Sequence, residues 1–398
     1  MSLVVSDVLM PRVYDVLSLV VSDVVSSCVN KLPSDYILWA IVVGLVVTGA
    51  YLVIYYWVLM PKVEAVADST ILSMALTIAA GTGGLVLLVV NYRKQHDLEE
   101  SRFVERFGAA TAQLGHEDVA IRLAGVYALV GVAERTRYRG QIQQCIDVLC
   151  GYLRLPYEPN TAEPHQTSKV IKRPGKDAAN FAREEHYKYR QNDAVVRQTI
   201  VTVIAEHLQR KARYKWSSFA FNFTGVYFED ATFDRAVFSG EQVSFERATF
   251  GGAKAWFNGA TFSGERTSFL GATFSGERTW FDGATFSGER TWFDDVTFGA
   301  ALTWFKGTTF SGERTSFCGA TFESELAWFV EATFNGDKTS FKGVTFVGKE
   351  VDFRNPRQWN PAPHFDWDNP DSGVLKPDNV RPEEWPPTEK CDPVSGDS

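Results

Sequence analysis

The spacing of hydrophobic residues changes twice along this chain of 398 residues. Up to residue 92, two long stretches contain no charged side chain. From 93 to 208, apolar residues recur in steps of four, three and four, which is typical of helices that bury one face. From 238 to 353, Phe recurs in steps that alternate between seven and five residues. These changes predict an α-helical first half followed by an all-β repeat.

The two uncharged stretches run from Tyr36 to Met60 and from Ser69 to Tyr92. A helix of about 20 apolar residues crosses the hydrocarbon core of a bilayer, so each stretch is long enough to span it. The linker between them, Pro61 to Asp68, is short and would make the two helices antiparallel neighbours. We therefore expect a transmembrane helical hairpin in 35–92, with a buried helical pair of a soluble protein as the alternative.

Charge next to these stretches predicts how the hairpin is oriented. Arg93 and Lys94 follow the second stretch, and positive residues favour the cytoplasmic side. The expected location is therefore the cell membrane, multi-pass, with both termini cytoplasmic. Residues 1–34 carry a Val- and Leu-rich helical stripe, so this N-terminal segment is expected to be amphipathic. It would lie along the membrane surface or pack on a neighbouring helix, and the sequence leaves both open.

Residues 93–215 are expected to form a small cytoplasmic helical domain. Each of three helical stripes places four apolar residues on one face, and a fourth helix is expected from Asp193 onward. Gly115 and Gly140 are expected to separate the three stripes as stop signals. The three stripes are Phe103, Phe107, Ala110 and Leu114, then Val119, Leu123, Val126 and Val130, and then Ile142, Ile146, Leu149 and Leu153.

A charged and Pro-containing segment, 156–192, separates the third and fourth helices. The region 93–215 contains 21 Lys and Arg against 15 Asp and Glu, so its net charge is +6. A solvent-facing loop is the simpler interpretation of 156–192, because charge runs usually face solvent. The alternative is contact with anionic lipid, for which the candidate residues are Lys169, Lys172, Arg173 and Lys176.

The C-terminal half is built from a unit of twelve residues that reads A-T-F-S-G-E-R-T-W-F-D-G. The position two before each Phe is nearly always small, as at Ala260, Ala272 and Ala284. One outward position shows that two such units make one coil, because Trp recurs there in every second unit. These Trp residues are Trp256, Trp280, Trp304 and Trp328.

This pattern resembles the pentapeptide-repeat family, whose units centre on Leu or Phe with a small residue two positions before it. The resemblance covers about residues 219–353 of an expected domain 216–353, and it implies a bacterial chain with a right-handed quadrilateral β-helix, with Phe and the small residue inward. Within each unit of twelve residues, one step between successive Phe has five residues and the other has seven. We therefore expect a two-residue bulge at two corners of each coil of about 24 residues. Residues 354–398 contain many Pro and no period, and are expected to be a tail or a cap.

The expected fold class is therefore multi-domain, α then all-β: two transmembrane helices, a small helical domain and the pentapeptide-repeat solenoid. Some members of the family look like duplex DNA in shape and charge and bind gyrase, which gives an alternative function. However, 216–353 contains 11 Lys and Arg against 18 Asp and Glu, so its net charge is −7. Spread over the whole segment, this charge is much less dense than that of duplex DNA. An acidic column (Glu241, Glu265, Glu289, Glu313, Asp337) is also expected beside a mainly basic one (Gln242, Arg266, Arg290, Arg314, Lys338).

No motif for catalysis, metal binding or cofactor binding stands out. The five Cys are scattered, and neither a CxxC pair nor an HExxH motif is present. The Gly-rich stretch Gly81–Gly84 lacks the pattern of a phosphate-binding loop. We therefore predict no catalytic residue, no metal ligand and no cofactor, and hence no enzyme. The overall charge of −8 gives no reason to expect nucleic acid as a partner.

These observations together predict a non-enzymatic, membrane-anchored scaffold whose β-helix presents one face to a protein partner. The candidate interaction face is the Trp column, because an exposed apolar strip marks interaction sites. In the alternative, each Trp lies across its neighbours and only packs the coils. The sequence names no partner and leaves open whether the chain forms a homo-oligomer.

Overall fold

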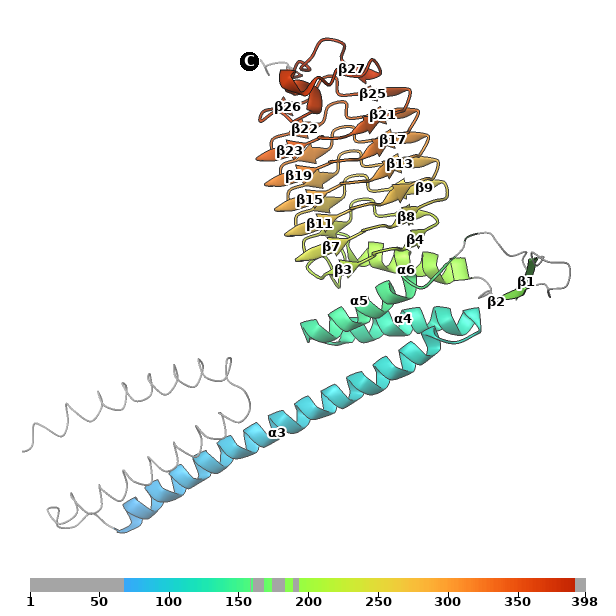
Figure 1. The fold of residues 1–398 in the computed structure, drawn as a ribbon. Helices are drawn as coiled ribbons and strands as arrows, with labels where there is room; N and C mark the ends of the chain where they lie inside the picture. Colours follow the sequence, from blue (N-terminus) through green and yellow to red (C-terminus); the bar gives the residue numbers. More distant parts are fainter. Residues whose placement is uncertain (1–67, 158, 160–167, 174–182, 189–192, 391–398) are drawn as a thin grey trace, which may run out of the picture. The chain divides into compact units, whose positions relative to one another are not determined.

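The computed structural model describes residues 68–157, 159, 168–173, 183–188 and 193–390. The chain divides into two compact units, with the boundary between Glu99 and Glu100. Four described helices precede a β-solenoid of about six coils with about 24 residues in each (Figure 1). The helices are α3 (Asp68–Leu114), α4 (Val119–Arg135), α5 (Arg139–Leu153) and α6 (Asp193–His207).

The predicted transmembrane hairpin needs correction. Within the described part of the chain, no helix combines the length and the apolar character needed to cross a membrane. The second predicted span, Ser69–Tyr92, belongs instead to α3, which continues into the charged residues beyond Tyr92. The prediction counted uncharged residues, and that count includes Ser, Thr and Asn, whose side chains are polar, and Gly, which has no apolar side chain. The multi-pass membrane location and its topology are therefore wrong as predicted, and Tyr36–Met60 lies outside the described residues.

The helices form where their stripes predicted them. Asp118 caps the N-terminus of α4, because its Oδ1 accepts a hydrogen bond of 2.7 Å from the backbone N–H of Ala120. Leu114, at the end of α3, is buried, and so are most members of the other two stripes. Gly140, however, lies in the first turn of α5 and does not separate two helices.

Each complete coil passes through four parallel sheets in turn. The sheet that we call the Ser sheet contains β3 (Phe221–Asn222), β7 (Gln242–Ser244), β11 (Arg266–Ser268), β15 (Arg290–Trp292), β19 (Arg314–Ser316) and β23 (Lys338–Ser340). The Trp sheet contains β5 (Ala231–Thr232), β9 (Lys254–Trp256), β13 (Arg278–Trp280), β17 (Leu302–Trp304), β21 (Leu326–Trp328), β25 (Glu350–Asp352) and β27 (Val380–Arg381).

Two sheets with strands of two residues connect them. One contains β4 (Tyr227–Phe228), β8 (Thr249–Phe250), β12 (Thr273–Phe274), β16 (Thr297–Phe298), β20 (Thr321–Phe322) and β24 (Thr345–Phe346). The other contains β6 (Val237–Phe238), β10 (Thr261–Phe262), β14 (Thr285–Phe286), β18 (Thr309–Phe310), β22 (Thr333–Phe334) and β26 (Gln358–Trp359). In chain order the Ser sheet and the Trp sheet alternate with these two, so they lie on opposite faces of the coil.

The register confirms that two units of the repeat make one coil. Trp256 pairs with Trp280, Trp280 with Trp304, and Trp304 with Trp328 in adjacent strands. The Phe rings and the small residues point inward as expected, and the Phe rings of successive coils stack in four columns. Phe257 and Phe281, for example, have centroids 4.8 Å apart and planes 5° apart. Because each ring buries roughly 150–250 Å², these columns dominate the packing of the solenoid.

Two kinds of corner alternate around each coil. At the five-residue steps, the chain turns as in a type II turn: the Ala284 N–H donates to the Phe281 carbonyl over 2.9 Å, and Gly283 has φ of 62°. At the seven-residue steps before the Ser sheet, the second residue after the Phe is a buried Gly that faces the coil below, whereas before the Trp sheet this position is Gly, Ala300 or Ser324. A Cβ on Gly288 would lie 2.0 Å from the Gly264 carbonyl oxygen, so only Gly fits this corner.

Both ends of the aromatic core are covered within the second unit. At the N-terminal end, α5 contacts β3 and α6 contacts β5, and Trp216 is buried between the helices and the first coil. At the C-terminal end, the short helices η2 (Asp366–Asp368) and η3 (Pro370–Ser372) and strands β26 and β27 belong to a segment that places four aromatic side chains over the last Phe residues. These four are Trp359, Phe365, Trp367 and Trp385.

The charged segment 156–192 contains a two-stranded antiparallel sheet rather than a loop throughout. Strands β1 (Ser168–Arg173) and β2 (Arg183–Lys188) pair so that Lys172 is opposite Glu184. The sequence pattern does not predict these strands, because charged residues dominate their composition. A short alternation of charged and apolar residues, as in β1, is a weak signal on its own.

The inward and outward assignment can be tested by substitution. We expect Phe293→Ala to reduce the free energy of unfolding by about 3–5 kcal/mol, because it removes a fully buried ring. We expect Thr273→Ser, at a half-buried outward position, to change it by less than about 0.5 kcal/mol. Urea denaturation followed by circular dichroism measures both. Similar losses at the two sites would contradict the assignment.

The two kinds of corner make a second test. Gly283→Ala meets no described atom within 4 Å but places a Cβ at positive φ, for which we expect a loss of about 1–2 kcal/mol. Gly288→Ala should cost more, because its Cβ would collide with the backbone of the preceding coil. Thermal unfolding of both variants gives the order. A larger loss for Gly283→Ala would show that close approach of the coils is not what requires Gly288.

Candidate interaction face

The Trp column occupies one outward line of the Trp sheet. It lies in strands β9, β13, β17 and β21, which Figure 1 labels. The four indole rings stack face to face, with centroids 5.0–5.3 Å apart and planes within 10° of each other. Stacked in this way, the rings present their edges, and not their faces, to the outside. The column ends at Asp352, a buried carboxylate that pairs with Arg354 over 2.6 Å.

Each Trp also packs its neighbours. The four side chains are half-buried, and their indole nitrogens are shielded, with no hydrogen-bond acceptor within reach among the described residues. A buried donor without a partner costs about 1–3 kcal/mol, so the ring contacts have to offset that cost. The Trp column therefore stabilises the solenoid, whatever else its outer edges contact.

A second outward column of the Trp sheet, two residues before each Trp, changes character along the solenoid. Lys254 and Arg278 lie over the rings of the Trp in their own strands, with Lys254 Nζ 4.8 Å from the centroid of Trp256. The next two members of the column are Leu302 and Leu326, which are half-buried. At this point of the repeat, the other strands of three residues from β7 to β23 have Arg, Lys or Gln.

These two Leu residues complete an apolar area on two adjacent coils, which we call the Leu–Trp patch. It consists of Ala301, Leu302, Trp304, Leu326, Trp328 and Val330. Charged residues surround it, among them Arg278 and Lys306. An apolar patch with a polar rim is typical of a protein–protein contact. The sequence signal for the patch is the presence of Leu in place of Arg or Lys at two positions of the repeat.

The described strands of the Ser sheet, on the opposite face, carry no such area. Their mainly basic outward column is unbroken, because Gln242, Arg266, Arg290, Arg314 and Lys338 pair in register. At the Trp position, the five strands from β7 to β23 of this sheet carry Ser in four cases, and Trp292 is the exception. The two broad faces of the solenoid therefore differ in chemistry although their interiors are alike.

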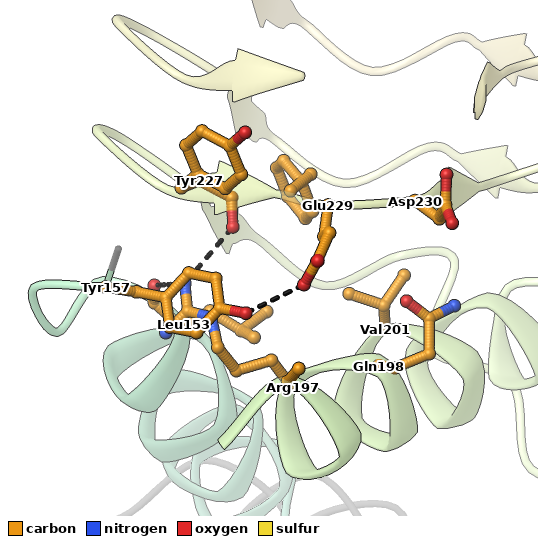
Figure 2. A pocket seen from close by; sticks show the side chains of 10 residues that line it. Leu153, Tyr157, Arg197, Gln198, Val201, Tyr227, Glu229 and Asp230 are labelled. Carbon is orange, nitrogen blue, oxygen red and sulfur yellow. Dashed lines mark hydrogen bonds between the residues drawn. The ribbon is translucent and has the colours of Figure 1, made fainter. Parts of the chain in front are cut away.

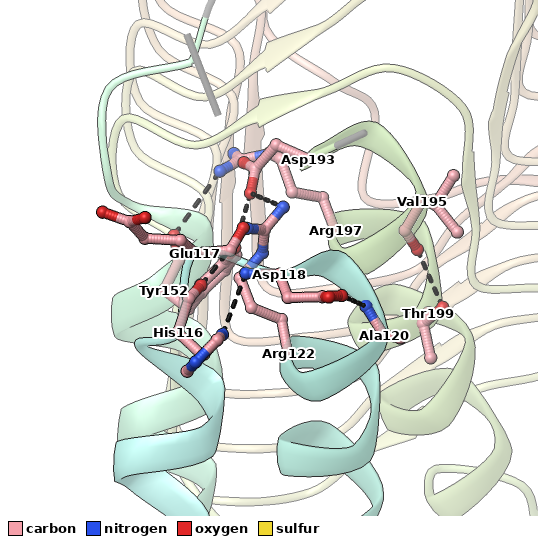
Figure 3. Close-up of polar contacts among 10 residues, drawn as sticks. All are labelled: His116, Glu117, Asp118, Ala120, Arg122, Tyr152, Asp193, Val195, Arg197 and Thr199. Atoms are coloured by element: carbon pink, nitrogen blue, oxygen red, sulfur yellow. Dashed lines mark hydrogen bonds and ion pairs between the residues drawn. The ribbon is translucent and has the colours of Figure 1, made fainter. Parts of the chain in front are cut away.

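The junction between the helices and the first coil contains a cluster of buried polar groups (Figures 2 and 3). Arg197 of α6 donates hydrogen bonds to the carbonyls of Tyr152 and Leu153 at the end of α5, and to the Tyr227 carbonyl in β4. Its guanidinium carbon also lies 4.4 Å from the centre of the Tyr157 ring. One buried cation thus joins two helices to the solenoid.

Other polar side chains of the junction also have partners inside the protein. Tyr157 donates to Glu229 over 2.7 Å, and burial together with this carboxylate raises the pKa of the tyrosine. Arg122, fully buried, donates to the Glu117 carbonyl over 2.6 Å and lies 3.9 Å from Asp193 (Figure 3). The cavity beside Arg197 holds about 10 Å³, which is room for one water molecule (Figure 2). This cluster therefore has the features of a structural junction.

Reactive chemistry has little support among the described residues. No group of three or more His, Cys, Asp or Glu side chains there could hold a metal ion. Burial raises the pKa of both Cys145 and Cys150 to about 12, so these thiols stay protonated and are poor nucleophiles. Of the candidate lipid contacts, Lys169, Lys172 and Arg173 lie in β1, and Lys176 lies outside the described residues. Their contact with lipid stays a prediction.

The role of the junction can be tested at Arg197. We expect Arg197→Met to reduce the free energy of unfolding by about 3–5 kcal/mol, because three backbone carbonyls lose their buried cationic donor. The exposed Arg210→Met is the matched control and should change it by less than about 0.5 kcal/mol. Denaturant titration compares the two. Equal small effects would show that Arg197 is not part of the connection.

Comparison of the chain with models of protein families, with curated proteins and with solved structures finds no match. What the geometry establishes is a β-solenoid with about 24 residues per coil, and this is consistent with a pentapeptide-repeat fold. The features that distinguish this chain are therefore those of its own surface, above all the Leu–Trp patch.

Proposed function

We propose that this protein is a non-enzymatic scaffold whose β-solenoid binds a protein partner through the Leu–Trp patch. The observation that carries the proposal is the replacement of a cationic residue by Leu at two successive coils, Leu302 and Leu326. Elsewhere in the repeat this position is polar and the coil forms equally well. The two Leu side chains are therefore not required by the fold, and contact with a partner accounts for them.

The neighbouring Trp residues suit the same role. Trp304 and Trp328 stack with centroids 5.3 Å apart, which holds their outer edges in fixed positions beside the two Leu. Rigid aromatic side chains lose little conformational entropy on binding and are enriched where interface energy concentrates. A flat sheet of parallel strands adds a stiff support. These features favour a partner that is itself a folded protein surface.

We also propose that the solenoid is a pentapeptide-repeat β-helix. Support comes from the four-sided coil, the inward Phe, and the small residue buried two positions before it, as at Ala260 and Ala284. The seven-residue steps place their additional residues at two corners of each coil and leave the Phe columns in register. A binding role, and not catalysis, fits the regular outer surface of the solenoid.

Site-specific photo-cross-linking tests the proposed face. A photoreactive amino acid at Leu326 should cross-link a discrete partner in cells, and Leu302→Arg should remove that cross-link, because it restores the residue type of the repeat and breaks the apolar area. The fold should be retained, since Arg occupies the same place at Arg278. Circular dichroism and thermal unfolding of the variant check this.

The Ser sheet supplies the control. A photoreactive amino acid at Arg314 occupies the equivalent position on the opposite face, and Arg290→Leu adds an apolar residue there. Neither change should affect cross-linking at Leu326. Equal cross-linking from both faces, or an undiminished cross-link in the folded Leu302→Arg variant, would contradict the proposal.

A further inference from the structure

We propose that the Leu–Trp patch binds the same patch of a second copy of this chain, so that two solenoids pack face to face with antiparallel axes. The inference rests on the proposed function and names the partner of that face. Its basis is the charge order along the Trp sheet, which is complementary to itself in one arrangement.

The arrangement follows from the register of the sheet. A two-fold axis that runs along the strand direction, midway between Leu302 and Leu326, exchanges the two coils of the patch. Leu302 of one copy then faces Leu326 of the other, and Trp304 faces Trp328. Face-to-face sheets pack about 10 Å apart, a distance that such side chains fill. The centre of the contact is thus made of four coils, two from each copy, and the charged Glu325 and Lys306 lie at its edges opposite Ala301 and Val330.

The same axis brings opposite charges together at the rim. It relates the coil of Trp280 to the coil of Asp352, three coils further along the chain. Within these two coils, Glu277 faces Lys349, Arg278 faces Glu350, and Asp282 faces Arg354, and by symmetry each pair occurs twice. All three pairs join opposite charges, and the pair of Glu277 with Lys349 carries the argument, because Arg354 already pairs with Asp352 and Glu350 within its own chain. The first pair is exposed on both sides, as expected for the rim of a contact.

Other arrangements of the same face bring like charges together. A two-fold axis parallel to the solenoid would place Glu277 opposite Asp282 and Lys349 opposite Arg354. If the proposed axis is moved toward the N-terminus by half the distance between adjacent coils, it passes through the coil of Leu302 and places Glu277 opposite Glu325. If it is moved by the same distance toward the C-terminus, it passes through the coil of Leu326 and places Lys306 opposite Arg354. Like charges across an interface penalise wrong registers, so the charge order favours the proposed one.

Charge reversal in the full-length chain tests this geometry. Sedimentation equilibrium should show a dimer, and either Glu277→Lys or Lys349→Glu should weaken its association about fivefold to tenfold, because each makes two facing pairs repulsive. An equimolar mixture of the two single variants should recover association, because every positive position then faces a negative one in the mixed dimer. Glu265→Lys at the corner before the Ser sheet is the matched control and should have no effect.

Each other outcome overturns the inference. A chain that stays monomeric, or a dimer that neither reversal affects, would show that the copies do not meet through this face. Stronger association of the Glu277→Lys variant would indicate the axis parallel to the solenoid. The proposed function fails separately: a cross-link from Leu326 to a different protein, lost in Leu302→Arg, would retain the scaffold while removing the second copy as its partner.

Discussion

The Phe rings of successive coils stack nearly parallel, with centroids 4.5–5.5 Å apart, and this contact determines how closely one coil lies on the next. That spacing matches the separation of hydrogen-bonded strands, so stacking and backbone pairing reinforce each other. It also explains the glycines of the seven-residue corners, since Gly288 touches the backbone of the coil below it. The ends need covering for the same reason, because the last ring of each column would otherwise meet water. Trp216 at one end and Trp385 at the other lie where that exposure would occur.

The interior and the exterior of the solenoid have different periods. Inside, every unit of the repeat brings the same Phe, small residue and turn, so opposite sides of a coil are nearly equivalent. Outside, the Trp and Ser positions repeat only once in each whole coil, and this separates the Trp sheet from the Ser sheet. Stability therefore depends on the shorter period and surface identity on the longer one. Leu302 and Leu326 depart from the residue type that both periods place at their position, which is why they are informative about function.

The sequence predicted the solenoid well because its signal is one-dimensional. Spacing alone gives the coil length, the inward Phe and the additional residues at the corners, and the structure agrees with each. The Leu–Trp patch was harder, because it depends on which side chains become neighbours across two strands, as Leu302 does with Leu326. The contacts of Arg197 link α6 to α5 and β4, which are separated along the chain, and no local sequence pattern predicts them. The predicted transmembrane hairpin needed correction, because no helix in the described part of the chain is both long and apolar enough to cross a membrane.

The two periods also limit how such a chain can change its length during evolution. Duplication or loss of one unit leaves the Phe columns intact, and the product folds, but every outward residue beyond that point moves to the opposite side of the coil. A change by two units, which is one whole coil, preserves both the core and the identity of each surface. Trp292 lies on the Ser sheet, opposite Ser268. A Trp at this place is what would result if one twelve-residue unit of the Trp side were copied into the Ser side. Selection for a surface therefore acts on whole coils, whereas selection for stability alone would accept half of one.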